Sequence, residues 1–160
     1  MSQGFLTVEF TREQLYRINS DIGIFVAVLE GKTIGYLMAE SVDFAAGSPL
    51  IAHMVARLKE FIFDGVPLMS CRVFVYGPVC IDERHRGQRI LDALFCAMLE
   101  SLHGRYDAGV AFVSMLNARS FNAHTNKLRM RIADEFEFSG QKYWTLVFAV
   151  KRHEGTLGTA

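Results

Sequence analysis

The sequence predicts a single α/β domain built on a mixed β-sheet. Segments rich in β-branched and aromatic residues alternate along the chain with segments whose apolar residues recur at helical spacing. Hairpin signals occur near both ends of the chain, and a hairpin places its two strands antiparallel. The length of 160 residues and the hydrophobic content of 51% are sufficient for one domain with its own core.

The first 21 residues are expected to form an N-terminal segment ahead of the main domain. Gly4–Phe10 either supplies a short opening strand or belongs to a shortened N-terminal part. Thr11 and Gln14 have the spacing of a capping box, which predicts a helix from this point. Residues 22–151 then make up the domain, and residues 152–160 are expected to be a flexible tail.

A hairpin and a helix open the domain. Ile22–Glu30 and Thr33–Glu40 predict two strands joined by a turn at Gly31-Lys32. Ser48-Pro49 provides an N-cap followed by proline at the first helical position. The helix is expected to extend to the turn at Asp64-Gly65. Its apolar stripe would consist of Leu50, Ile51, Met54, Val55, Leu58, Phe61 and Ile62.

The next strand, Arg72–Ile81, is interrupted by Gly77-Pro78. Proline cannot donate a hydrogen bond to a sheet ladder, so its presence inside a strand indicates an irregularity. We therefore expect a bulge that bends this strand away from one neighbour. A polar loop follows, and Ile90–Leu102 then predicts a helix that buries an apolar stripe against the sheet.

The last third of the chain predicts a strand, a helix and a second hairpin. Asn117 is a suitable N-cap for the helix, which would run to about residue 128. The strands are expected at Gly109–Leu116, Ile132–Phe138 and Lys142–Val150, with the hairpin turn at Ser139-Gly140.

Composition excludes several classes of function. The 17 Lys and Arg residues balance 17 Asp and Glu residues, which argues against a nucleic-acid partner, and the apolar runs are too short to cross a membrane. Cys71, Cys80 and Cys96 are odd in number and contain no CxxC pair, which argues against disulfides or structural zinc and favours a cytoplasmic location. The five histidines have no metal-ligand spacing, so no metal is expected.

Positive charge gathers in the loop before the helix at residue 90. Arg84, His85, Arg86 and Arg89 lie where a helix N-terminus already carries partial positive charge. A bound anion would relieve this repulsion and accept hydrogen bonds from the unpaired N–H groups. The loop is therefore either a phosphate-binding site or a solvated basic turn.

The order of motifs resembles the GNAT superfamily of acyl-CoA-dependent N-acyltransferases. The loop Arg86-Gly87-Gln88-Arg89-Ile90-Leu91 is similar to its pyrophosphate signature, although Arg89 and Leu91 stand where small residues are usual. Asn117, Ser120 and His124 match a downstream pattern in which the last position is usually tyrosine. The resemblance implies a mostly antiparallel sheet with flanking helices and a splayed central strand pair.

The resemblance also implies a role for each group of residues. The backbone of Val79, Cys80 and Ile81 would bind the pantetheine arm and the thioester, and residues 86–91 would bind the pyrophosphate. Asn117 and Ser120 would contact the pantetheine arm or the phosphate.

The catalytic assignments remain open at this point. His124 would protonate the leaving thiolate, or it is a hydrogen-bonded core histidine. Glu83 would serve as the general base for the amine, or it is a loop carboxylate that balances Arg84 and Arg86 and leaves the proton to water. Cys80 is expected to be a packing residue rather than a nucleophile.

The expected function is transfer of an acetyl group from acetyl-CoA to the primary amine of a small molecule or peptide. A non-catalytic GNAT-like acyl-CoA-binding or sensor module is the alternative. RNA binding through Arg84–Arg89 is weaker, because no aromatic platform lies beside this segment. The sequence is also compatible with a homodimer.

Overall fold

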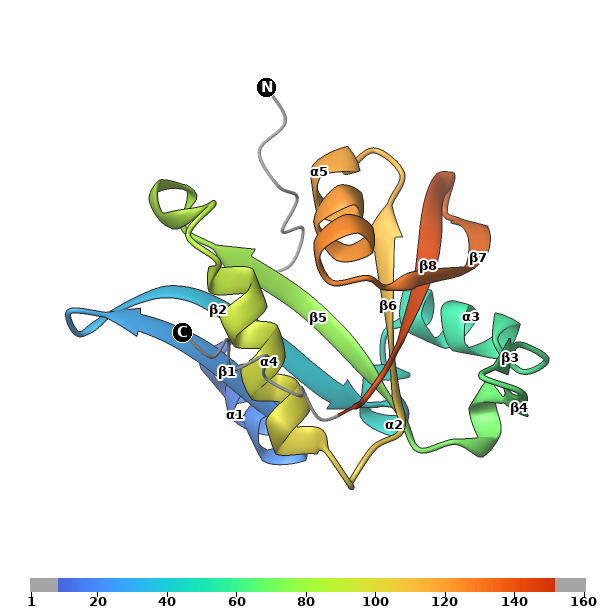
Figure 1. Ribbon diagram of the computed structural model, residues 1–160. Coiled ribbons are helices and arrows are strands. Elements are labelled where there is room, and N and C mark those ends of the chain that lie inside the picture. The colour runs from blue at the N-terminus through green and yellow to red at the C-terminus, as the bar shows by residue number, and fades with distance from the viewer. Residues whose placement is uncertain (1–8, 152–160) are drawn as a thin grey trace, which may run out of the picture.

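Six strands form one mixed sheet in the order β1-β2-β5-β6-β8-β7 (Figure 1). The computed structural model describes residues 9–151. Only β5 and β6 are parallel, and every other neighbouring pair is antiparallel. This arrangement confirms the expected mixed, mostly antiparallel α/β sheet. The strands are β1 (Gly23–Leu29), β2 (Lys32–Ser41), β5 (Val73–Ile81), β6 (Ala108–Ser114), β7 (Arg131–Phe138) and β8 (Gln141–Ala149).

The two faces of the sheet bury separate hydrophobic clusters. On one face, the long helix α4 packs Leu94, Met98 and Leu102 against the sheet, together with Phe74 of β5. On the other face, α3 and a small two-stranded sheet cover a cluster that includes Met54 and Phe63. The helices are α1 (Arg12–Asp21), α2 (Val42–Ala45), α3 (Pro49–Arg57), α4 (Ile90–Leu102) and α5 (Ala118–Asn122).

Several local predictions are confirmed. Thr11 and Gln14 form both hydrogen bonds of the capping box at the start of α1. Asn117 caps α5, which continues into a π-helical turn, η3 (Ala123–Lys127). The C-terminal hairpin turns at Ser139-Gly140 as expected. The strand predicted at Gly4–Phe10 falls mostly outside the described residues, and its last two residues, 9 and 10, are not in a strand.

The first hairpin turns one residue earlier than predicted. Leu29 pairs with Lys32, so Glu30-Gly31, rather than Gly31-Lys32, forms the two-residue turn. Both turn residues have positive φ, at 49° and 78°. A two-residue turn of this kind requires positive φ at both central positions, and glycine is the preferred second residue. This requirement fixes Gly31 at the second position.

The helix predicted to reach Ile62 ends at Arg57 instead. Phe61 and Ile62 lie outside it, and β3 (Ile62–Phe63) pairs with β4 (Val66–Pro67) in a small hairpin. Its turn, Asp64-Gly65, has positive φ at both residues. The prediction was wrong because this turn closes a hairpin rather than ending a helix.

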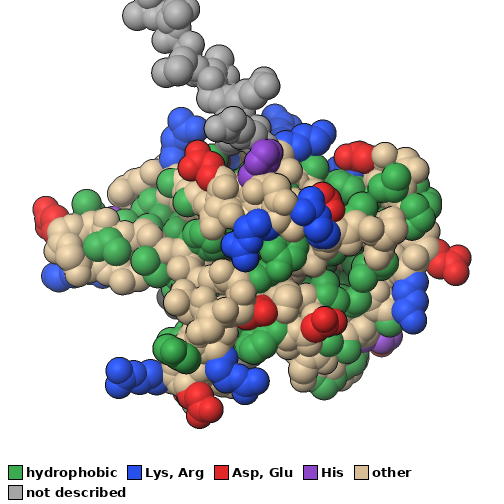
Figure 2. Space-filling model, turned by 90° about the horizontal axis from the view of Figure 1, so that it is seen from below, with side chains coloured by type: hydrophobic (Ala, Val, Ile, Leu, Met, Phe, Trp, Pro, Cys, Tyr) green, Lys and Arg blue, Asp and Glu red, His purple; other side chains and the backbone are tan. Residues whose placement is uncertain are grey.

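The surface mixes charges of both signs. On the face shown in Figure 2, blue Lys and Arg side chains lie among red Asp and Glu side chains rather than in one continuous patch. Within residues 9–151, no helix has the length and apolar character needed to cross a membrane.

Candidate functional site

The central parallel strands β5 and β6 separate after a short paired region. They pair only from Val73 to Val75 on β5, opposite Ala108 to Val110 on β6. Beyond this point β5 stays with β2 and β6 stays with β8. The V-shaped opening between the two strands is visible in Figure 1. The expected splayed strand pair is therefore present.

A bulge at Gly77-Pro78 lies where β5 leaves β6. Leu37 of β2 pairs with Val79, whereas Ala39 pairs with Tyr76, so one β2 residue faces both Gly77 and Pro78. A bulge of this kind bends its strand and breaks the ladder locally. The sequence prediction of a bend at this dipeptide is confirmed.

The bulge leaves backbone groups of β5 directed into the gap between β5 and β6. The Asp82 N–H donates to Ile34 O of β2 at 2.9 Å. In an antiparallel pair, the backbone N–H and C=O groups of every second residue point to the partner strand. Cys80, two residues before Asp82, therefore also directs its backbone groups to β2. Val79 and Ile81 direct theirs away from β2. Three residues were predicted to offer backbone groups to the cosubstrate. The backbone groups of Val79 and Ile81 point into the gap, and those of Cys80 point away from it.

The loop after β5 is held in place by Asp82. Its carboxylate accepts from the backbone N–H of Arg84 at 3.0 Å and pairs with the Arg84 guanidinium at 2.7 Å. These hydrogen bonds with Arg84 hold the pKa of the Asp82 carboxyl well below its usual range. Asp82 thus fixes a short 3₁₀ turn, η2 (Glu83–His85), immediately before the predicted pyrophosphate loop.

Arg86 lies at the junction between the strand and this loop. Its Nε donates to the Ile81 carbonyl at 3.1 Å. The bond anchors the guanidinium beside the gap, while its two terminal nitrogens make no hydrogen bond or ion pair with any residue from 9 to 151. These terminal N–H groups are suited to bidentate binding of a phosphate.

Two residues in the loop before α4, Gly87 and Arg89, have positive φ. Gly87 has φ of 82°, and Arg89, the residue before α4, is left-handed with φ of 60° and ψ of 20°. Left-handed backbone is the conformation that glycine adopts most easily. The Arg89 side chain is 88% exposed and its guanidinium lies 3.8 Å from the Asp92 carboxylate, so it points outward from the loop.

The remaining signature residues lie along the same segment. Gln88 is exposed, whereas Ile90 and Leu91 are half-buried in the first turn of α4. Their backbone N–H groups belong to the unpaired first turn of a helix, where an anion is stabilised.

Asn117, Ser120 and His124 form a connected chain of hydrogen bonds. Asn117 Oδ1 accepts from the Ser120 N–H at 3.0 Å. His124 Nδ1 lies 2.7 Å from the Ser120 carbonyl oxygen and 3.3 Å from its hydroxyl. A carbonyl can only accept, so Nδ1 carries the proton in this neutral imidazole.

Tyr76 completes this chain from the other side of the gap. Its hydroxyl lies 3.0 Å from His124 Nε2, which is the acceptor once Nδ1 carries the proton. Tyr76 is the first β5 residue beyond the last β5–β6 pair. Burial lowers the pKa of His124 and raises the pKa of Tyr76, so both are neutral. Tyr76 was not predicted as a site residue from the sequence. The only feature that could have indicated it is a hydroxyl group at the end of an apolar run, Val73–Tyr76.

Glu83 and Cys80 are not part of this hydrogen-bonded chain. Glu83 is exposed on η2, in the loop that follows β5. Cys80 is a free, half-buried thiol in β5, and the described residues place no hydrogen-bonded base on its sulfur. The structure thus places the predicted residues in three groups: the end of β5, the loop before α4, and the hydrogen-bonded chain around the buried His124.

Comparisons with known proteins find the same architecture. No family model and no curated protein matches this chain by sequence. Among solved structures, smu.2055 of Streptococcus mutans is 16% identical with a TM-score of 0.63, and covers 92% of this chain and 82% of its own. Ard1 of Thermoplasma volcanium is 13% identical with a TM-score of 0.63, covering 91% of this chain and 84% of its own.

A third similar structure was solved with a ligand. The putative acetyltransferase yncA of Salmonella typhimurium, determined with its cofactor acetyl-CoA, is 14% identical with a TM-score of 0.52. It covers 85% of this chain and 69% of its own. At these identities the likeness establishes the fold. The chain therefore has the fold of the GNAT acetyltransferases.

Proposed function

We propose that this protein is an N-acyltransferase that moves an acetyl group from acetyl-CoA to a primary amine. The observation that carries the proposal is the gap between β5 and β6, which opens beside a basic loop at the N-terminus of α4. A long cosubstrate with an amide-bearing arm and a pyrophosphate matches these two features. Val79 and Ile81 offer backbone groups in the gap, and Arg86 offers its two terminal nitrogens at the mouth of the gap.

The pyrophosphate would bind where α4 begins. The backbone from Gly87 to Leu91 supplies N–H groups, and Arg86 supplies a guanidinium already oriented by Ile81. Hydrogen bonds to a charged partner contribute about 1.5–3 kcal/mol each, which is about a tenfold to hundredfold change in affinity. Asn117 and Ser120 are proposed to contact the pantetheine arm or the phosphate, as the resemblance implies.

The amine would attack the thioester carbonyl carbon directly. A carbon–nitrogen bond forms as the carbonyl oxygen becomes an oxyanion, and the carbon–sulfur bond then breaks to release the thiolate. The Val79 N–H, turned toward the gap, would donate to that oxyanion. Glu83 is proposed as the base that removes the proton from the attacking amine.

His124 would return a proton to the thiolate through Tyr76. When His124 carries a second proton, on Nε2, the 3.0 Å contact allows that proton to pass to the Tyr76 oxygen while the Tyr76 proton passes to sulfur. The products are a neutral thiol, a neutral tyrosine and a neutral imidazole. The lowered pKa of His124 makes its protonated form scarce but a stronger acid.

A non-catalytic acyl-CoA sensor is the second candidate, because both nitrogens of the His124 ring already have partners. Under this alternative the same cosubstrate binds, and the pair of Tyr76 and His124 only holds the two sides of the gap together.

Two measurements test these proposals in turn. Titration with acetyl-CoA should raise the melting temperature, and Arg86→Ala should weaken binding at least tenfold. The control Arg105→Gln removes an exposed arginine beyond the far end of α4 and should bind normally. Absence of any shift at millimolar acetyl-CoA would contradict both candidates.

Thiol release with a panel of amines and peptides then separates an enzyme from a sensor, which would bind without turnover.

A further inference from the structure

Among residues 9–151, no strand pairs with the C-terminal end of β8 on the side of β7. The neighbouring strand β7 begins at Arg131, which pairs with Val147. The Val150 N–H donates to Asp107 O at 2.9 Å, so the backbone groups of Val150 point toward β6. Because backbone directions alternate, the N–H and C=O of Ala149 face the opposite side, where β7 has not begun. This part of the edge can accept another strand.

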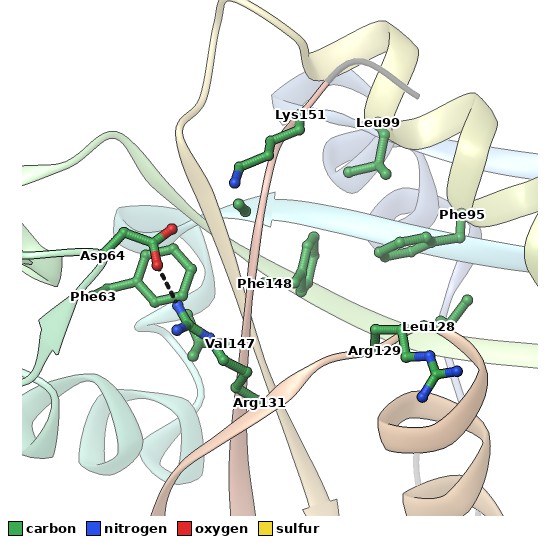
Figure 3. A pocket seen from close by; sticks show the side chains of 11 residues that line it. Phe63, Asp64, Phe95, Leu99, Leu128, Arg129, Arg131, Val147, Phe148 and Lys151 are labelled. Atoms are coloured by element: carbon green, nitrogen blue, oxygen red, sulfur yellow. Dashed lines mark hydrogen bonds and ion pairs between the residues drawn. The ribbon is translucent and has the colours of Figure 1, made fainter. Parts of the chain in front are cut away.

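A cavity of about 570 Å³ surrounds this edge. As Figure 3 shows, Phe95 and Leu99 of α4 lie with Phe148 on one side of β8, and Phe63 and Asp64 lie on the other. A second hollow of about 240 Å³ continues from Ala149 toward Cys71. The open edge therefore has apolar walls above both faces, where an added strand would place its alternating side chains.

The charge of this cavity is positive. Arg131 pairs with Asp64 at 2.8 Å and lies over the Phe63 ring at 4.3 Å, so this cation is already balanced. Arg129 and Lys151 also line the cavity, and neither forms an ion pair with any residue between 9 and 151. In Figure 3 the Lys151 amino group extends along the same side as Phe63 and Asp64. The excess of two positive charges favours an acidic partner.

We propose that the β8 edge binds an extended acidic peptide segment of another protein, which adds as a strand beside Ala149. An added strand would use the N–H and C=O of Ala149, and an alternation of apolar and acidic residues fits the two walls. Apolar side chains would contact Leu99 and Phe148, and acidic ones would approach Lys151. This site shares no residue with the proposed acetyl-CoA site, so the two proposals stand or fall separately.

The first test uses two labelled peptides and fluorescence anisotropy. The peptide Val-Glu-Val-Glu-Val-Glu should bind, and Val-Lys-Val-Lys-Val-Lys should not. Lys151→Glu should weaken binding of the acidic peptide at least tenfold. The matched control is Lys32→Glu, the same charge reversal at an exposed residue of the first hairpin. Equal binding of the two peptides, or equal effects of the two substitutions, would overturn the proposal.

The second test removes the backbone donor. Ala149→Pro deletes the N–H that faces the open edge and leaves the ladder to β6, which uses Val150, intact. It should abolish binding. If this variant does not fold, the acidic peptide N-methylated at alternate residues should fail to bind the unchanged protein. Strong binding of the N-methylated peptide, or of the folded variant, would contradict strand addition.

Two other occupants are distinguishable. Sedimentation that shows a dimer dissociated by Ala149→Pro, together with no peptide binding, would assign the edge to a second copy of the chain. Peptide binding that appears only after deletion of residues 152–160 would assign it to the end of this chain. Either result overturns the proposal, and the acetyl-CoA melting shift on the same variants reports separately on the proposed enzyme.

Discussion

The Tyr76 hydroxyl and His124 Nε2 form a buried hydrogen bond of 3.0 Å that connects the two sides of the central gap. Tyr76 belongs to β5, at the point where that strand leaves β6, and His124 belongs to the segment that follows β6. The rings meet edge to face, with centroids 5.4 Å apart. The bond therefore fixes the distance between the elements proposed to enclose the thioester.

Tyr76→Phe should lower both stability and turnover. It keeps the ring packing but leaves the buried His124 Nε2 without a partner, a loss of about 1–3 kcal/mol. Under the proposed proton transfer, turnover should fall about a hundredfold with acetyl-CoA affinity unchanged. Chemical denaturation, steady-state kinetics and an acetyl-CoA titration measure the three quantities.

Tyr106→Phe is the matched control, since Tyr106 packs against Phe74 outside the gap and should retain full turnover. Normal turnover in Tyr76→Phe, with the same loss of stability, would identify the bond as structural only. That outcome would remove Tyr76 from the mechanism.

Stability should decrease as the pH falls below neutrality because of His124. Burial lowers its pKa in the folded state below the ordinary histidine value of about 6.5, so the unfolded chain binds the proton more readily. This contribution is fully present above the unfolded pKa and is lost as the pH falls below it, by at most about 1.4 kcal/mol per pH unit. Melting temperatures measured from pH 7.5 to 5 should show the decline.

His124→Gln provides the comparison for this pH dependence. Glutamine does not titrate, so the variant should lose less stability than the natural protein across the same range. Other titrating groups, including the half-buried Glu40, are present in both proteins and cancel in the difference. Identical curves for the two proteins would contradict the assignment of the decline to His124.

Local chemistry explains which parts of the fold could be predicted from the sequence. The capping box at Thr11 and the turn at Ser139-Gly140 depend on residues a few positions apart, and both predictions are confirmed. The same holds for the bend at Gly77-Pro78, because proline and glycine restrict or release the backbone at their own positions. Such signals do not depend on the rest of the molecule.

The remaining features depend on contacts between distant residues. Tyr76 and His124 are 48 positions apart, and no spacing rule connects a strand residue to a later helix. The end of α3 was missed because Phe61 and Ile62 fit a helical stripe as well as a hairpin that buries Phe63. The open edge at Ala149 depends on where β7 begins, which the register of β7 on β8 decides.

Any side chain at Gly109 should lower the stability of the protein. A Cβ at this position in β6 would overlap the ring of Phe148, which packs edge to face against Phe74 and Tyr76. Gly109→Ala should therefore destabilise the protein by about 1–3 kcal/mol, the usual range for overpacking a core. Gly47→Ala is the control, because its Cβ would meet only one atom, at an ordinary 3.5 Å. Equal denaturation midpoints for the two variants would contradict this packing.

Arg89 adopts a left-handed backbone at the start of α4, and two substitutions separate the effect of that backbone from the effect of its charge. Arg89→Gly and Arg89→Ala both remove the guanidinium, but only alanine keeps the steric penalty of a φ of 60°, about 1–2 kcal/mol. The glycine variant should therefore melt at the higher temperature. Both should weaken acetyl-CoA binding to the same small extent, since the side chain is 88% exposed. If alanine were at least as stable as glycine, the left-handed conformation of this residue would be wrong.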